Sequence, residues 1–372
     1  MGLNRSTIAG LAAELGAAGI VEHTGPAAVS RQGAGRPSAE VRLAVEGPYV
    51  VAVDLGVAHV AVARVGLGGR VLERTEAELP ADPEAWKVGA AVAAQIRTVL
   101  REAPRGAPLV GIGVGVPGLV RSGDGLVRLA PNLNWHDVAF TSVVLAALGL
   151  DIPITVANDA DLGALAEHQR GAGVDVDDLI YVTGNVGVGA GIIAGGHPLR
   201  GVAGYAGEVG HLRFDPAGAP CHCGNVGCWE TVVGGPALAK ALGLATTDMT
   251  GIVGALDALE RPTEELCAIG GDLGRGLAGI VNAFNPQRVI LGGYYTALYQ
   301  LVRDEVDRGL SAASLAAPRT SVRLALPGLG SDSVLLGAAE MAFEPLLTDP
   351  VEGLASSIVD VNSALSDALP LG

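Results

Sequence analysis

Hydrophobic and polar positions alternate along most of the chain with the periods of an α/β protein. The segments YVVAVDL and HVAVARV predict two paired strands, and the almost continuous apolar run PLVGIGVGV predicts a strand that is buried on both faces. Apolar side chains in residues 83–102 recur at the spacing of an amphipathic helix. The first half of the chain is therefore expected to build a sheet that helices cover.

The same organisation returns in the second half. Strand patterns in PITVAND and DLIYVTGN are followed by the Gly-rich hairpin VGVGAGII, a helix near 264–284, the strand RVILGG and a final helix in GSDSVLLGAAEMAF. This order predicts an α/β fold of two lobes with a cleft between them. The expected boundaries are lobe I at 47–156, completed by the helix near 331–344, lobe II at 157–330, and an apolar tail at 345–372.

Residues 1–46 follow a different pattern, a short helix and then two strand-like segments around a Gly/Pro-rich turn. Asn4 or Ser6 can cap the helix, and Gly19 ends it. A helix followed by a β-hairpin is the second half of a winged helix-turn-helix, which is a DNA-binding module. A helix that packs on the main body accounts for the pattern equally well.

Composition and charge limit the functions open to the chain. Its 372 residues are 49% hydrophobic, no apolar run reaches membrane-spanning length, and the chain opens without a signal-peptide pattern. We therefore expect a cytoplasmic protein with no membrane partner. The net charge of −15 opposes contact with nucleic acid. Residues 1–42 hold four arginines against three glutamates, a balance of +1, so a DNA-binding role would have to lie in that segment.

The segment HLRFDPAGAPCHCGNVGC contains the side chains of a metal site. His211, Cys221, Cys223 and Cys228 supply one nitrogen and three sulfurs, which is a full tetrahedral set for Zn²⁺. Four protein ligands leave no open position, so the metal is expected to be structural and not a Lewis acid. Free thiols in a loop are the alternative. His222, between two of the cysteines, is expected to face solvent.

Two carboxylates lie beside the predicted metal site. Glu208 precedes His211 by three residues, and Glu230 follows the last cysteine by two. A zinc ion would fix these groups relative to one another, and the second ring nitrogen of His211 could then donate to a hydroxyl group. Donors and acceptors in such a set suit a polyol such as a sugar, although an isolated glutamate is more often a solvated surface group.

Further polar side chains are expected at the cleft. Asn158 and Asp159 end the strand PITVAND, where a side chain would point into the space between the lobes. Asp159 could take a proton from a sugar hydroxyl or accept a hydrogen bond from it. Asn132, in APNLNW, is a further candidate to line the pocket. An Asn-Asp pair is as often part of a turn.

Five motifs then occur in a fixed order: GVPG, PNLNW, AND-AD, GYAGEVGH and CHCGNVGCWE. With these motifs, residues 49–343 resemble the ROK family of sugar kinases and sugar-responsive repressors. The resemblance implies the two-lobed actin-like ATPase fold, which is ribonuclease H-like. It also implies zinc on the histidine and three cysteines, and Asp159 as the general base if phosphoryl transfer occurs. The sugar ligands it implies are Asn158, Asp159, Glu208, His211 and Glu230.

The phosphate-binding loops depart from the kinase pattern. Kinases of this family carry DxGGTK and a motif resembling GTGxGxG, whose backbone and side-chain donors hold ATP phosphates. This chain reads DLGVAH, where Val57, Ala58 and His59 replace the second glycine, the threonine and the lysine, and NVGVGAG, where Asn185 and Val186 replace a glycine and a threonine. Because a valine side chain cannot donate a hydroxyl hydrogen bond to phosphate, the two loops favour sugar sensing without sugar phosphorylation. The residues that remain from the two loops are Asp54, Gly56, Gly187 and Gly189.

The resemblance also gives the N-terminal segment a role. The recognition helix of the family's repressors would present Asn4, Arg5, Ser6 and Thr7 to the DNA major groove, and Arg36 in the wing would reach the minor groove. Two more helices precede this point in those repressors. We therefore expect either that the start is internal to a longer gene product or that the DNA-binding ancestor has decayed to a sugar-binding protein.

Three hypotheses follow. The first is a ROK-family repressor with structural Zn²⁺, a monosaccharide or amino-sugar effector in an interlobe pocket, operator DNA as partner, and a homodimeric or homotetrameric state. The alternative is an ATP-dependent, glucokinase-like sugar kinase that uses Asp159 as general base with ATP and Mg²⁺. The third is a sugar-binding protein with neither activity. The hydrogen-bonding residues alone do not select one sugar.

Overall fold

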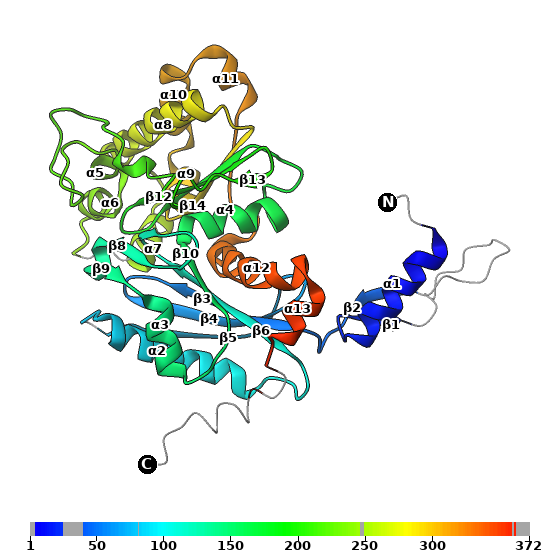
Figure 1. Cartoon of the computed structure of the whole chain (residues 1–372). Helices are drawn as coiled ribbons and strands as arrows, with labels where there is room; N and C mark the ends of the chain where they lie inside the picture. Colours follow the sequence, from blue (N-terminus) through cyan, green and yellow to red (C-terminus); the bar gives the residue numbers. More distant parts are fainter. Residues whose placement is uncertain (1–3, 25–39, 81, 246–248, 359–360, 362–372) are drawn as a thin grey trace.

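The computed structural model describes residues 4–24, 40–80, 82–245, 249–358 and 361. Its body contains two five-stranded sheets with helices between and outside them (Figure 1). The first sheet has the strand order β10-β6-β3-β4-β5, in which β4 is antiparallel to both neighbours and β10, β6 and β3 are parallel. Its strands are β3 (Tyr49–Leu55), β4 (His59–Gly66), β5 (Arg70–Glu78), β6 (Leu109–Val116) and β10 (Ile154–Asn158).

Helices cover both faces of this first sheet. Every residue of β6 is buried, as the continuous apolar run predicted. One face packs on α2 (Ala85–Arg101) and α3 (Phe140–Leu148), and the other packs on α12 (Ser333–Thr348). A small sheet that the hydrophobic pattern did not predict adjoins it, with strands β7 (Leu119–Val120), β8 (Val127–Ala130) and β9 (Trp135–Val138) and the 3₁₀ helix η1 (Pro131–Leu133).

The second sheet has the order β13-β12-β11-β14-β15 and is also covered on both faces. α4 (Asp159–Arg170) packs on the face that lies toward the first sheet, and the long α8 (Glu264–Phe284) packs on the outer face. The strands are β11 (Leu179–Gly184), β12 (Val188–Ala194), β13 (His197–Pro198), β14 (Arg288–Gly293) and β15 (Arg323–Ala325). Shorter elements around them are η2 (Val209–His211), α5 (Glu230–Val233), α6 (Gly235–Leu242), α7 (Met249–Asp257), α9 (Tyr295–Leu301), α10 (Arg303–Ala313), α11 (Ala316–Ser321) and η3 (Gly330–Asp332).

The two halves meet where α4 packs against α12 (Figure 1). Their backbones approach closely at Gly337, whose missing side chain leaves room for the carbonyl group of Leu162. The buried carboxylate of Glu167 joins the end of α4 to the start of α12. It accepts hydrogen bonds from the backbone N–H groups of Gly328 (2.8 Å) and Leu329 (3.0 Å) and from the Ser333 hydroxyl (2.7 Å). This junction holds α4 and α12 together.

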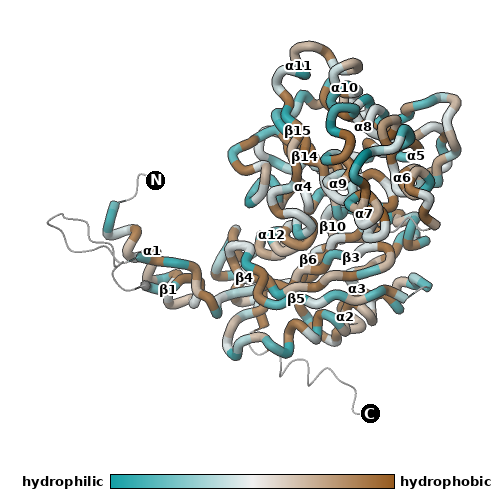
Figure 2. Tube along the Cα trace, turned by 180° about the vertical axis from the view of Figure 1, so that it is seen from behind, coloured by the Kyte–Doolittle hydropathy of each residue, from teal (hydrophilic) through white to brown (hydrophobic). Residues whose placement is uncertain are grey.

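The N-terminal segment stands away from the body (Figure 2). α1 (Arg5–Ala17) begins with the predicted Asn4 cap, and a hairpin of β1 (Val21–Thr24) and β2 (Glu40–Leu43) follows it. No residue of α1 is buried, and the apolar side chains of Ile8 and Leu11 are exposed. Helix and hairpin therefore form the arrangement expected of the second half of a winged helix, and α1 does not pack on the body.

Residues 345–358 contain helical structure that the sequence pattern did not predict. α12 continues to Thr348, four residues beyond the predicted helix, and α13 (Pro350–Ala355) folds back on it. The backbone of Ile358 then pairs with Leu109 at the end of the first sheet. Residues 345–358 thus complete the lobe I side of the molecule. Within the described ranges, no helix is both long and apolar enough to cross a membrane.

Candidate functional site

The histidine and three cysteines that the sequence singled out come together. η2 brings in His211, and the loop after Pro220 turns back through the Gly224 and Gly227 positions, where φ is +91° and +71°. A side chain at Gly227 would overlap the backbone of Asp215, so the tight return of the loop requires glycine there. The four ligand atoms all lie within 4.8 Å of one another.

The spacing of these atoms fits a tetrahedral zinc site. His211 Nδ1 lies 3.7 Å from Cys221 Sγ, and the sulfurs of Cys223 and Cys228 lie 3.6 Å apart. Zinc with bonds of about 2.3 Å to sulfur and about 2.0 Å to nitrogen would place its ligand atoms about 3.5–3.8 Å apart. The donor set is complete, so an ion held there would have no open coordination position.

The second ring nitrogen of His211, Nε2, lies on the side of the ring opposite to Nδ1. Nε2 lies 4.0 Å from the nearer carboxylate oxygen of Glu208, which is too far for a direct hydrogen bond and suits a bridging hydroxyl group. Partial burial and the negative charges of Asp159 and Glu230 raise the pKa of Glu208 to about 7. Its side chain is 43% exposed, so solvent screening moderates these effects.

Glu230, the first residue of α5, is buried and held at both carboxylate oxygens. Oε2 accepts a hydrogen bond from the backbone N–H of Val188 at 2.8 Å, and Oε1 lies 3.3 Å from His222 Nδ1. The preceding residue, Trp229, anchors this position: it is fully buried and donates from its indole N–H to the carbonyl of Asp272 at 3.1 Å. The carboxylate is therefore fixed in direction.

Asp159 is 8% exposed and begins α4. Burial raises its pKa to about 6, although hydrogen bonds oppose that shift. Its Oδ1 accepts from the backbone N–H of Ala160 at 2.9 Å, and its Oδ2 accepts from the side-chain amide of Asn185 at 3.3 Å. Asn185 replaces a glycine of the kinase motif, and the sequence analysis gave it no role. It now ties the second Gly-rich loop to this carboxylate.

Asn158 is used mainly within the protein. Its Oδ1 caps α4 by accepting from the N–H groups of Ala160 (2.8 Å) and Asp161 (3.1 Å), and its Nδ2 donates to the Gly118 carbonyl at 2.9 Å. One amide hydrogen remains for a ligand. Asn132, in η1, is half-buried, and among the described residues no side-chain hydrogen bond joins it to the carboxylates.

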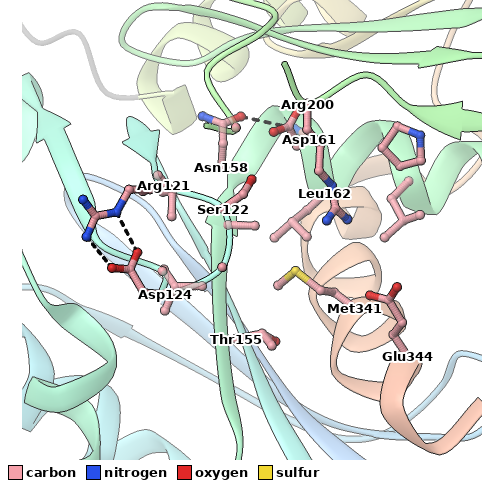
Figure 3. Close-up of a pocket in the computed structure, with 18 of the residues that line it drawn as sticks. Arg121, Ser122, Asp124, Thr155, Asn158, Asp161, Leu162, Arg200, Met341 and Glu344 are labelled. Carbon is pink, nitrogen blue, oxygen red and sulfur yellow. Dashed lines mark hydrogen bonds and ion pairs between the residues drawn. The ribbon is translucent and has the colours of Figure 1, made fainter. Parts of the chain in front are cut away.

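Asn158 also lines a cavity of about 250 Å³ (Figure 3). Its walls are the turn 121–125, the edge of β10, the first turns of α4, the loop 198–204 and the end of α12. Burial raises the pKa of Asp161 in this wall to about 7, and the charge of Arg200 opposes the shift. Of the predicted sugar ligands, Asn158 lines this cavity, whereas Asp159, Glu208, His211 and Glu230 do not.

The first predicted phosphate loop is a closed turn between β3 and β4. The Gly56 N–H donates to the carbonyl of His59 at 2.9 Å, and the His59 ring lies against Gly56. Val57 packs on the core of the first sheet. Burial, followed by the charge of Asp159, raises the pKa of Asp54 to about 7. The Gly56 N–H is thus hydrogen-bonded within the loop, and Val57 contributes an apolar side chain to it.

The second predicted phosphate loop is backed by an aromatic residue that the sequence analysis missed. Tyr294 is fully buried, its ring fills the space in front of Gly184, and its hydroxyl group lies 3.5 Å from the Gly187 carbonyl. A side chain at Gly187 would overlap Glu230, and one at Gly189 would come within 3.1 Å of the Ala160 side chain. The glycines of this loop are therefore needed for contacts within the protein. The paired tyrosines after RVILGG were the available sequence signal.

The proposed DNA-contacting residues form a local network at the start of α1. The side-chain oxygen of Asn4 accepts from the Thr7 N–H (2.9 Å), the Ser6 hydroxyl (2.7 Å) and the Thr7 hydroxyl (3.0 Å). Arg5 is exposed in the same turn. Arg36, the proposed wing residue, lies outside the described residues.

Comparison with known proteins extends these observations. The ROK family profile matches residues 50–344. The xylose repressor of Bacillus subtilis strain 168 is 31% identical, in a match that covers 93% of this chain and 89% of that protein.

Two solved structures represent the two kinds of relative. A ROK family glucokinase from Streptomyces griseus, in complex with glucose and AMPPNP, has a TM-score of 0.67 at 28% identity over 79% of this chain and 98% of that one. A ROK family transcriptional regulator, described as a homolog of the E. coli MLC protein, has a TM-score of 0.71 at 26% identity over 98% of this chain and 92% of that one. The predicted two-lobed actin-like ATPase architecture is confirmed. The chain belongs to the ROK family.

Proposed function

We propose that this chain is a sugar-responsive transcriptional repressor that binds a monosaccharide in its interlobe cleft and does not phosphorylate it. The observation that carries the proposal is the contrast between two sets of residues. The carboxylates at 159, 208 and 230 lie together with His211, so the acceptors for sugar hydroxyls are in place. Both loops that would hold ATP phosphates have lost donors.

The sugar would be held by fixed acceptors around a rigid metal site. Asp159 and Glu230 are buried and hydrogen-bonded, so they would meet sugar hydroxyls without first being reoriented. Glu208 and the Nε2 atom of His211 would share one hydroxyl across the 4.0 Å gap between them. Zinc on the histidine and three cysteines would hold His211 in that direction.

The N-terminal segment supports the DNA-binding part of the proposal. The match to the ROK regulator covers 98% of this chain, whereas the match to the glucokinase covers 79%, about the share that residues 50–344 make up. α1 and its hairpin precede residue 50, and they stand free of the body where they could reach DNA. A cytoplasmic, homodimeric or homotetrameric repressor would couple sugar-driven movement of the lobes to two such arms.

The proposal is tested by binding and turnover measurements on the purified chain. Isothermal titration with D-xylose, D-glucose and N-acetyl-D-glucosamine should detect binding of at least one sugar, and Asp159→Asn should weaken it. Gel shifts on DNA selected from a random duplex library should show a complex that this sugar alters. Sugar binding without any DNA complex would leave a sugar-binding protein with neither activity.

The glucokinase-like alternative is favoured by one observation. The carboxylate of Asp159 is buried and has a pKa near 6, which suits a general base near neutral pH. Incubation with ATP, Mg²⁺ and the same sugars distinguishes the two functions. ADP formation that requires both the sugar and Asp159 would overturn the repressor proposal, and its absence is the expected result.

A further inference from the structure

His222 has no role in the zinc site or in the proposed sugar contacts, yet it is not simply a solvated side chain. Its Nδ1 lies 3.3 Å from Glu230 Oε1, and its ring meets the ring of His211 edge to face, with centroids 5.7 Å apart. The side chain is 41% exposed, so one side of the ring faces solvent and the other faces the buried carboxylate. The sequence-based expectation that His222 faces solvent is confirmed, and the ring in addition contacts this carboxylate.

We propose that His222 is a positioning residue that holds the Glu230 carboxylate in the direction needed to accept a sugar hydroxyl. This inference rests on the proposed function and concerns the same pocket. His222 itself would not touch the sugar. Its neutral ring would donate from Nδ1 to Oε1, while the Val188 N–H, at 2.8 Å from Oε2, holds the other oxygen.

The zinc site makes this donor necessary. The Cys221 thiol also lies beside Oε1, at 3.8 Å. A cysteine that ligates zinc has no S–H to donate, and its sulfur carries negative charge. With the metal bound, His222 Nδ1, at 3.3 Å, is then within reach of Oε1 as a donor and the thiol is not. Without it, the carboxylate would be free to turn away from a sulfur of like charge.

The position of His222 in the chain links it to the metal. It stands between Cys221 and Cys223, so two metal bonds would fix the backbone on both sides of it. His211 supports the ring from the side. Loading of the metal would therefore set the direction of the His222 ring, and through it the direction of Glu230. A metal held by His211, His222 and Glu230 is the competing arrangement, since their ligand atoms also lie within 4.8 Å of one another.

Three variants test the role of His222. His222→Ala removes the donor, His222→Asn places an amide N–H near the former Nδ1, and His222→Gln extends the amide farther out. The exposed His23 on β1 supplies a matched control, His23→Ala. We expect one zinc per chain in every protein. For a sugar that the wild-type chain binds, His222→Ala should raise the dissociation constant about 10-fold, the factor that corresponds to the loss of one hydrogen bond. His222→Asn should restore most of the affinity.

A second measurement separates positioning from general weakening. Among monodeoxy derivatives of the same sugar, the one that lacks the hydroxyl bound by Glu230 should bind wild type and His222→Ala about equally, and Glu230→Gln should abolish the effect of His222→Ala. Zinc loss in His222→Ala would assign His222 as a metal ligand and overturn the inference. Equal affinity of wild type and His222→Ala for the parent sugar would overturn it while leaving the proposed function intact. Absence of sugar binding by the wild type would overturn both.

Discussion

The Gly187→Ala variant tests whether the second Gly-rich loop supports the proposed sugar site. A Cβ at this position would lie 3.1 Å from the Glu230 Cδ atom and would overlap Oε2. The φ of Gly187 is not in the left-handed region, so alanine causes no backbone strain there. Glu230 would have to move and give up its 2.8 Å hydrogen bond from the Val188 N–H. A hydrogen bond to a charged group contributes about 2 kcal/mol, which corresponds to about a 30-fold loss of sugar affinity.

Isothermal titration without nucleotide measures this loss. Gly254→Ala, on α7, is the matched control, because the added methyl group there meets no atom within 4 Å. Zinc content and the thermal midpoint show whether Gly187→Ala is folded. If Gly187 were retained only so that phosphate can approach, sugar binding in the absence of nucleotide would not change. A folded, zinc-loaded Gly187→Ala protein whose affinity stays within twofold of wild type would refute the reasoning.

Three further predictions concern stability and metal. Glu167→Ala should lower the free energy of unfolding by about 4 kcal/mol, because it leaves the backbone N–H groups of three partly buried hydrogen bonds and the buried Ser333 hydroxyl without their acceptor. Urea unfolding measures this loss, and a value below about 1 kcal/mol would contradict it. Burial raises the pKa of Asp159 from 3.8 to about 6. The charged form of Asp159 therefore lowers the free energy of unfolding by about 3 kcal/mol, and this penalty is absent below pH 4 and complete above pH 6. Asp159→Asn should therefore be more stable than wild type at pH 8 and equal to it near pH 3.5, and a constant difference across pH would count against this origin. Chelation of zinc, or Cys223→Ser, should reduce the zinc content from one per chain to none and should lower both the thermal midpoint and the sugar affinity. Unchanged sugar affinity in zinc-free protein would show that the metal does not support the pocket.

Elements with a strong hydrophobic period were predictable. The helix expected near 264–284 is α8, with the same bounds, and the continuous apolar run became the buried β6. The small sheet β7–β9 was not predicted, because strands of two to four residues carry too few alternations to form a pattern. The extension of α12 to Thr348 was not predicted, and it includes Pro345, a residue type that usually ends a helix.

The cluster of His211 and the three cysteines was the most predictable part of the candidate site, since its residue types and spacing lie within one short segment. The hydrogen bonds of the cleft were not predictable in the same way. Asn158 reads from sequence as a sugar ligand, but its carbonyl oxygen caps α4. Asn185 and Tyr294 gain their roles from residues that lie far away in the chain, Asp159 and Gly184. Partners of this kind are set by packing, which a pattern of residue types does not encode.

The glycines at the second loop explain how a phosphate motif can persist after its donors are lost. Gly184, just before the motif, leaves room for the Tyr294 ring, and Gly187 leaves room for the Glu230 carboxylate. Each glycine is thus required by a contact inside the protein, whether or not a nucleotide binds. Replacing a threonine by Val186 removes a donor to phosphate and disturbs none of these contacts. Substitution of the donors with retention of the glycines is therefore the pattern expected when a sugar site is kept in use and phosphoryl transfer is not.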